Sequence, residues 1–266
     1  MVHMNLAIVM PVILKHVPLW DLTRECVAHL RTSHSASLYV ICNALHVCTA
    51  QELRDDLRGH FPGPVFVLNE PGVSRSVAGS WNAGAEMAFA RGAQFVAVIA
   101  NDAFLRPDCL DQMIAFGESR QAEIWSGISY NNRTTIDAAA VADGADFTCF
   151  MFPSSTLETF GPFDTNFKPA YFGDNDYYAR VVLGGGRCRV LHSAQFFHHG
   201  SMTIRHDPDA AHHVRHWFDL NRAYFHRKWG VSEPAANAED VFARYYRHPF
   251  NDPARPLSWF PENGNP

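Results

Sequence analysis

Short apolar runs alternate with amphipathic segments through the first half of the chain, and this alternation limits the folds that the chain can adopt. The apolar runs predict strands at residues 6–10, 38–42, 65–68 and 95–100. The helical spacing of apolar residues predicts helices at residues 19–31, 49–59 and 77–92. Strands that alternate with helices form a parallel sheet with crossover helices, so the sequence predicts an α/β fold.

The second half of the chain has fewer regular segments. A strand is predicted at residues 147–152, a short helix from Ser155, and two longer helices at residues 174–183 and 212–229. Residues 130–146 have no clear period and are predicted to form a loop. The Pro-rich segment at residues 231–266 is expected to be a tail that wraps around the surface.

The composition is that of a globular domain. Of the 266 residues, 47% are hydrophobic and 18% are charged, which excludes a disordered chain and allows a large core. The net charge of −5 argues against a nucleic-acid partner, because nucleic-acid binding depends on clustered Lys and Arg side chains.

The six cysteines are scattered without any C-x-x-C spacing, which predicts free thiols in a reducing compartment. No stretch approaches the roughly 20 apolar residues of a membrane span. We therefore expect a soluble, cytoplasmic protein with no membrane span, which can still meet a lipid-linked molecule by peripheral contact with a membrane surface.

An acidic residue follows directly after one of the predicted strands. The apolar residues 95–100 lead into Asn101 and Asp102. Ligands of parallel α/β sheets bind beyond the carboxyl ends of the strands, so Asp102 is expected to face a bound group. A carboxylate at this place can hold a divalent cation that in turn holds a phosphate, whereas the alternative is a structural Asp in a turn.

Further motifs in the second half combine with Asp102 into a specific pattern. They are Gly161-Pro-Phe-Asp164, the acidic segment Asp174-Asn-Asp176 at the start of a helix, and His198-His-Gly-Ser201. In this order and with this spacing, the chain resembles the inverting family-two glycosyltransferases of GT-A fold over residues 5–230.

The resemblance implies a GT-A (nucleotide-diphospho-sugar transferase) fold with a mostly parallel central sheet flanked by helices. It also implies one domain at residues 1–230, with a nucleotide-sugar-binding half at residues 1–124 and an acceptor and catalytic half at residues 125–230. The loop at residues 130–146 is then expected on the acceptor side.

The resemblance further suggests which residues bind the donor. Pro11, Cys42 and Asn43 follow or end the first two predicted strands, at the sheet edge where a base and ribose bind. Asn82 matches the Asn of an Asn-x-Gly motif in the family and is expected either to pack or to hydrogen-bond the turn at Asn101 and Asp102.

For the metal, the resemblance implies Mn²⁺ or Mg²⁺ on Asp102. The first acid of the family motif is replaced by Ala100, so the cation is expected to arrive with the diphosphate. His198 resembles a late histidine of the family that completes the metal site. His199 is the alternative, because a shift of one residue on a strand reverses the face that a side chain occupies.

For the base, Asp174 aligns with the acid of a Glu-Asp pair in the family, and Gly173 replaces the Glu. Asp176 is a second catalytic candidate, although it can instead pair with Arg180 one helical turn later. Lys228, near the end of the last predicted helix, is expected to be structural, with a phosphate contact as the alternative.

The expected activity is transfer of a hexose or deoxyhexose from a nucleoside diphosphate sugar to a glycan, glycolipid or other hydroxyl acceptor, with inversion, in glycan or polysaccharide biosynthesis. One alternative is a transferase-derived carbohydrate- or nucleotide-binding protein that has lost activity, which the changes at Ala100 and Gly173 keep open. A nucleotidyltransferase is a further alternative, but residues 11–15 lack the Gly-rich, basic signature of that class.

Overall fold

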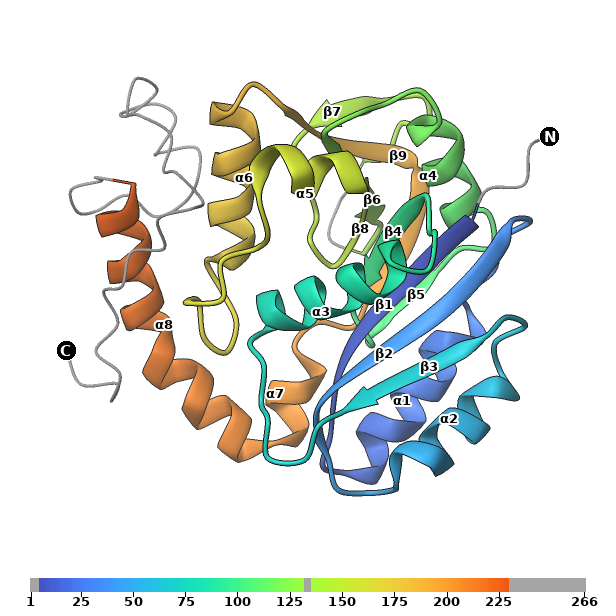
Figure 1. Cartoon of the computed structure of the whole chain (residues 1–266), viewed down its shortest axis with the longest axis vertical. Coiled ribbons are helices and arrows are strands. Elements are labelled where there is room, and N and C mark those ends of the chain that lie inside the picture. Colours follow the sequence, from blue (N-terminus) through green and yellow to red (C-terminus); the bar gives the residue numbers. More distant parts are fainter. Residues whose placement is uncertain (1–4, 132–134, 230–266) are drawn as a thin grey trace.

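The computed structural model describes residues 5–131 and 135–229, which form one mixed sheet with helices on both faces (Figure 1). The strand order is β3-β2-β1-β4-β8-β6-β9-β5, and β7 pairs with β9 beside this path. The strands are β1 (Asn5–Leu14), β2 (Ser35–Leu45), β3 (Val65–Asn69), β4 (Phe95–Ile99), β5 (Ala103–Leu105), β6 (Glu123–Ser129), β7 (Val141–Asp143), β8 (Cys149–Pro153) and β9 (Arg187–His198). The helices are α1 (Val17–Ala28), α2 (Ala50–Arg58), α3 (Val77–Phe89), α4 (Cys109–Gly117), α5 (Ser154–Phe160), α6 (Gly173–Leu183), α7 (Met202–His206) and α8 (Pro208–Lys228).

The first four strands form a parallel block within the sheet. β1 pairs in parallel with β2 and β4, and β2 pairs in parallel with β3. The second half is mixed, because β8 runs antiparallel to both β4 and β6, while β6 and β9 are parallel. The predicted α/β architecture is confirmed. Of the eight strand pairs in the described ranges, four are parallel and four are antiparallel, and the antiparallel pairs include β5, from the first half of the chain, with β9.

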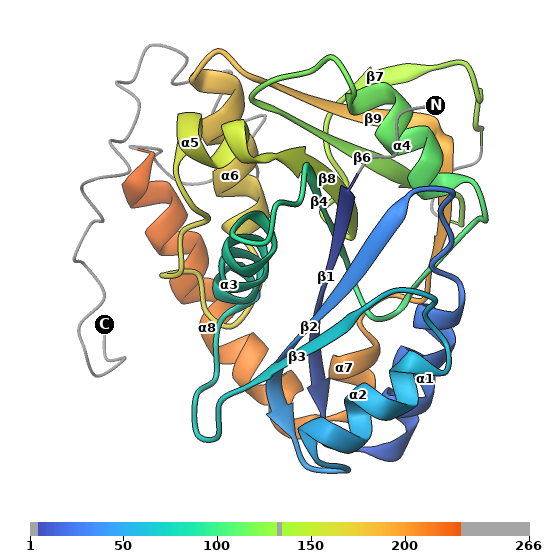
Figure 2. The same cartoon turned by 45° about the vertical axis from the view of Figure 1, so that its right-hand side comes forward.

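Side chains of β1 alternate between the two faces of the sheet, as the two-residue period of a strand requires. Leu6, Ile8 and Met10 pack in the core cluster that includes residues of α1, α2 and α4. Ala7 and Val9 pack in the cluster that includes residues of α3, α5 and α6. Figure 2 shows the resulting layers, with α1 and α2 on one side of β1–β3 and α3 and α6 on the other.

Helix α3 lies very close to the sheet at Gly84. A Cβ atom added at Gly84 would lie 2.3 Å from Cγ1 of Val9, so any side chain there would push α3 away from β1. Helix α3 leads to β4, whose carboxyl end carries Asp102 a few residues later. Gly84 therefore allows α3 to pack close to β1, in the layer that leads to the strand end carrying Asp102.

Helix α8 packs on α6 on the side away from the sheet. Phe167, Phe172 and Ala179 form a third apolar cluster with Tyr224, Phe225 and Trp229 of the C-terminal end of α8. The helix begins at Pro208 and not at residue 212, because the buried Asp207 side chain accepts hydrogen bonds from the amides of Asp209 and Ala210.

The prediction for residues 130–146 can also be compared with the structure, whereas that for residues 231–266 cannot. Part of the predicted loop at residues 130–146 is the short strand β7, which pairs with β9. The predicted tail at residues 231–266 lies outside the described residues. None of the helices in the described ranges is both long and apolar enough to cross a bilayer.

Candidate active site

A cleft of about 1040 Å³ opens at the carboxyl ends of β1, β2 and β4. The parallel direction of these strands places their ends at one edge of the sheet. On one side the cleft is bounded by the N-terminal parts of α3 and α6, and on the other by α7 and the first turns of α8. The polar residues that line it include Lys15, Asn43, Arg75, Asn101, Asp102, Asp146, Asp174 and His198.

The turn that carries Asp102 is held by neighbours on both sides of the strand. The Ala100 amide donates to the carbonyl of Thr148 at 2.8 Å. The Asn101 side chain donates to Oγ1 of Thr23 in α1 at 2.9 Å, and this contact fixes its amide group at the edge of the cleft. Asp102 itself is 6% exposed, so its carboxylate is presented within the cleft wall and not to bulk solvent.

Asp102 and His198 form a pair. Nε2 of His198 lies 3.3 Å from Oδ1 of Asp102, and the Met202 amide at the start of α7 donates to Oδ2 at 3.3 Å. Pairing of β5 with β9 aligns Ala103 with His198, which explains why the histidine lies beside the residue that precedes Ala103. Two segments almost a hundred residues apart in the sequence thus bring one carboxylate and one imidazole to the same place.

The two groups of this pair shift each other's pKa. Burial opposes ionisation of Asp102, but the hydrogen bond and charge of His198, together with the Met202 amide, outweigh it and lower the pKa of the carboxyl. Burial likewise opposes protonation of His198, yet Asp102 raises the pKa of the imidazole overall. The arrangement therefore favours a carboxylate at Asp102.

His199 takes a different position from His198. Its ring makes edge contacts with Phe104 and Phe197, each at 4.8 Å between centroids, and it is not among the residues that line the cleft. Its backbone amide donates to the carbonyl of Asp102 at 3.0 Å. Of the two candidate histidines, His198 therefore faces Asp102 and His199 packs between aromatic rings.

Asp174 lies in the first turn of α6 and lines the opposite wall of the cleft. Its Oδ1 accepts a hydrogen bond from the Asn175 amide at 2.9 Å, and within the described ranges no cationic side chain pairs with it. Burial raises the pKa of the Asp174 carboxyl, and the nearby charge of Asp146 adds to the effect. A half-buried carboxyl with a raised pKa at a cleft is suited to accept a proton during a reaction.

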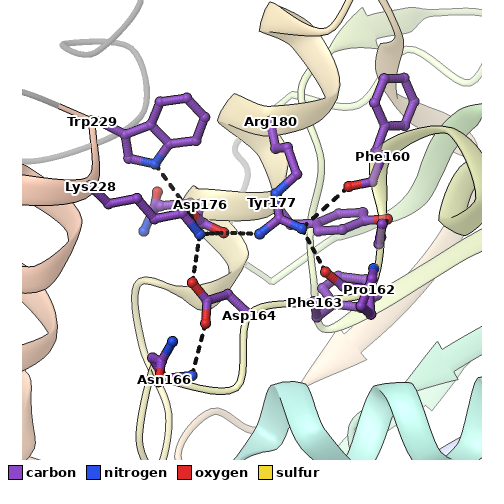
Figure 3. A network of polar contacts seen from close by, with 12 residues as sticks. Phe160, Pro162, Phe163, Asp164, Asn166, Asp176, Tyr177, Arg180, Lys228 and Trp229 are labelled. Atoms are coloured by element: carbon purple, nitrogen blue, oxygen red, sulfur yellow. Dashed lines mark hydrogen bonds and ion pairs between the residues drawn. The ribbon is translucent and has the colours of Figure 1, made fainter. Parts of the chain in front are cut away.

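Asp176 points away from the cleft into a buried polar network, which Figure 3 shows from close by. Arg180 of the same helix lies 2.7 Å from Oδ2, in the one-turn pairing that the sequence predicts. Lys228 lies 2.9 Å from Oδ1, and the Trp229 indole donates to Oδ1 at 3.0 Å. Lys228 also pairs with Asp164 at 2.6 Å, so this network joins α6 to the end of α8.

The remaining donor-binding candidates divide into two groups. Pro11 and Asn43 line the cleft, and Asn43 donates to Ser80 while its buried Oδ1 has no hydrogen-bond partner among the described residues. Cys42 is buried in the core, where burial raises the pKa of its thiol to about 12. The Asn82 side chain exchanges two hydrogen bonds with the backbone of Phe163 and does not line the cleft.

The structure adds cleft residues that the sequence patterns did not single out. Asp146 lines the cleft just before β8, with its amide bonded to Ser126, and its charge acts on both His198 and Asp174. Lys15 follows β1 and pairs with Asp207 at 2.8 Å. Asp146 falls in a loop without period or motif, so only its contacts across the sheet identify it.

Asp102 and His198 are suited to a cation that a bound ligand also coordinates. No group of three or more His, Cys, Asp or Glu side chains in the described part of the chain could hold a metal ion by itself. Asp102 and His198 supply one carboxylate and one imidazole, and Mg²⁺-type sites commonly combine one or two protein ligands with substrate phosphates and water. The pair therefore fits a cation that binds together with a diphosphate.

Comparison with known proteins gives structural matches only. No protein-family model matches the chain, and no curated protein matches it in sequence. The solved structure of S. aureus TarS residues 1–349 in complex with UDP-GlcNAc matches with a TM-score of 0.52 at 13% identity, covering 73% of this chain and 57% of that one. GalNAc-T7 with UDP, GalNAc and Mn²⁺ matches with a TM-score of 0.60 at 12% identity, covering 94% of this chain and 59% of that one.

A longer TarS structure matches with a TM-score of 0.58 at 12% identity and covers 91% of this chain. The chain spans 43% to 59% of the length of these solved structures. At such low identity the likeness establishes the fold and not the activity. The mixed sheet, the layers of helices and these matches together show that the chain has the GT-A fold of the glycosyltransferases that it resembles in structure.

Proposed function

We propose that the chain is a glycosyltransferase that moves a hexose or deoxyhexose from a nucleoside diphosphate sugar to a hydroxyl of a glycan, glycolipid or similar acceptor, with inversion. The observation that carries this proposal is that the Asp102–His198 pair and Asp174 line the same cleft at the strand-end edge of a GT-A fold. The matched TarS and GalNAc-T7 structures, which contain UDP-GlcNAc or UDP, support a nucleotide-sugar donor.

In the proposed reaction the acceptor oxygen attacks the anomeric carbon from the face opposite the diphosphate. A new bond forms between this oxygen and the carbon as the bond from the carbon to the diphosphate oxygen breaks, which inverts the configuration. The proton of the acceptor hydroxyl passes to the carboxylate of Asp174. The raised pKa of Asp174 makes this proton transfer more favourable than it would be for an exposed Asp.

Asp102 and His198 would hold Mn²⁺ or Mg²⁺ against the diphosphate. A cation bound there would neutralise the charge that develops on the leaving oxygen, which is where electrostatic stabilisation has its largest effect. Asn43 and Pro11 lie in the carboxyl-terminal parts of β2 and β1, where they can contact the base and ribose. A product of this kind would place the chain in glycan or polysaccharide biosynthesis.

We expect nucleotide and metal to bind cooperatively. Because Asp102 and His198 offer only two ligands, Mn²⁺ alone should bind weakly, whereas UDP and Mn²⁺ should each tighten the binding of the other by the same factor, on the order of tenfold. Calorimetric titrations in both orders would measure this coupling. Asp102→Ala should abolish it, and equal UDP affinity with Mn²⁺ and with a chelator in the wild-type chain would contradict it.

Donor hydrolysis tests whether the chain is an enzyme. Water can replace the acceptor at a competent site, so slow release of free sugar is expected from at least one uridine, guanosine or thymidine diphosphate sugar. A thermal-shift panel of these donors with and without Mn²⁺ would select the substrate, starting with UDP-GlcNAc. Hydrolysis should require a divalent cation and disappear in Asp102→Ala. Tight donor binding without hydrolysis, or without transfer to a broad acceptor panel, would favour the binding-protein alternative.

A further inference from the structure

Tyr171 has an unusual backbone conformation on the wall of the cleft. Its φ is 72° and that of Phe172 is 66°, so two successive residues with large side chains occupy the left-handed region. Such conformations are unfavourable for residues other than Gly, Asn and Asp, and they persist only where the surroundings enforce them. The Tyr171 side chain is nevertheless 41% exposed, so its conformation is not explained by burial of the ring.

The surroundings that enforce this conformation come from α8. The buried side chain of Asn221 donates to the carbonyls of Lys168, Ala170 and Tyr171 at 2.8 to 3.2 Å. Its Oδ1 accepts a hydrogen bond from the Lys168 amide at 3.1 Å. The loop before α6 is therefore fixed along its length by one amide side chain, and the direction of the Tyr171 side chain is fixed with it.

The ring of Tyr171 also packs against an aromatic residue of α8. Phe218 of α8 meets it edge-on, with the centroids 5.6 Å apart, and Phe218 itself packs on Phe172 at 5.2 Å. Phe218 is 37% exposed, so the two rings form an open aromatic surface, which we call the Tyr171–Phe218 surface. Tyr171 lines the cleft and precedes Asp174, the proposed base, by three residues.

We infer that the Tyr171–Phe218 surface binds the pyranose ring of a carbohydrate acceptor, an inference that rests on the proposed function. One face of a pyranose presents several C–H groups, which pack against an aromatic ring, while the hydroxyls at its edge remain free for hydrogen bonds. An acceptor held in this way would present a hydroxyl near Asp174. A linear polyol lacks such an apolar face and would gain little from this surface.

Saturation-transfer NMR measures this contact without requiring turnover. The probes are methyl β-D-glucopyranoside and methyl N-acetyl-β-D-glucosaminide, with glycerol and ribitol as linear polyols. In the wild-type chain, ring C–H protons of the pyranosides should receive saturation and the polyols should not. Tyr171→Phe should keep this signal, whereas Tyr171→Asn should weaken pyranoside binding by about tenfold, as expected for the loss of one aromatic contact.

Two controls separate loss of the surface from loss of the fold. Asn tolerates the left-handed region, so Tyr171→Asn should unfold at the same temperature as the wild-type chain or at a higher one. Tyr130 is similarly exposed, at 36%, but packs against Phe197 and Arg106 and does not line the cleft. Tyr130→Asn should therefore leave pyranoside binding unchanged.

Unchanged pyranoside binding in Tyr171→Asn, absence of pyranoside binding in the wild-type chain, or equal binding of ribitol would each overturn the inference. Nucleotide-sugar binding, measured separately by calorimetry, tests the proposed function. A chain that binds a nucleotide sugar and Mn²⁺ but shows any of these three results would retain the proposed function and lose only the Tyr171–Phe218 surface. A chain that binds pyranosides through Tyr171 but binds no nucleotide sugar would be a carbohydrate-binding protein.

Discussion

Asp174→Asn should lower the rate of sugar transfer by about a hundredfold or more, because loss of a general base acts on the chemical step. The amide oxygen of Asn can still accept the hydrogen bond from the Asn175 amide, so the first turn of α6 should remain intact. Affinity for the donor should change little. Single-turnover measurements with the donor that the thermal-shift panel selects would separate binding from chemistry.

The pH dependence provides a control for this assignment. Because the pKa of Asp174 is raised by burial and by Asp146, turnover in the wild-type chain should fall on the acid side at a higher pH than for an ordinary Asp. This acid limb should be absent from the residual activity of Asp174→Asn. Near-normal turnover of Asp174→Asn with the true acceptor would exclude Asp174 as the base.

Asp174→Asn should raise the free energy of unfolding although it lowers the rate of sugar transfer. The folded chain binds the Asp174 proton more tightly than the unfolded chain does, so the free energy of unfolding falls as the pH rises from the unfolded pKa through the raised folded pKa. Asp174→Asn removes this cost and should be more stable than the wild-type chain at pH 7. The difference should vanish below about pH 4, near the pKa of an unperturbed Asp.

Asp176→Asn should instead reduce the free energy of unfolding by about 3–5 kcal/mol, the usual cost of removing one charge from a buried ion pair. The Arg180 and Lys228 side chains are 4% and 8% exposed, and both would lose the carboxylate that they share. Urea unfolding followed by circular dichroism would measure the change.

Asp219→Asn is the matched control for Asp176→Asn. Asp219 also pairs with an arginine of its own helix, Arg222 at 3.1 Å, but its side chain is 76% exposed. Exposed pairs of this kind contribute about 0–1 kcal/mol, so this variant should unfold almost as the wild-type chain does. Equal stabilities of Asp176→Asn and Asp219→Asn would refute the structural role that the buried network assigns to Asp176.

The sequence predicted β1 to β4 and α1 to α3. These strands and helices follow from local periodicity, and the parallel direction follows from their alternation. Asp102 could be located for the same reason, because a residue that ends a parallel strand must lie at the ligand-binding edge whatever the remaining packing is. The strands β5, β6, β7 and β9 and the helices α4 and α7 were not predicted, and α8 was predicted to start at residue 212. The strand β7 and the helix start at Pro208 each depend on a contact outside their own segment.

The choice between His198 and His199 required the tertiary structure. Adjacent residues of a strand face opposite sides of the sheet, so the sequence pattern fits either residue equally. The register of β9 on β5, which aligns His198 with Ala103, determines that His198 faces Asp102. This register is a contact between segments far apart in the chain, and no local pattern contains it.

Local sequence patterns were enough to predict the α/β architecture, the position of Asp102 and the two acids at the start of α6. Which of these two acids faces the cleft depends on packing between segments that are far apart in the chain. Residues two apart in a helix point about 200° apart around its axis, so Asp174 and Asp176 cannot face the same side. Helix α8 decides the orientation of α6, because Lys228 and Trp229 pair with Asp176 and leave Asp174 at the cleft.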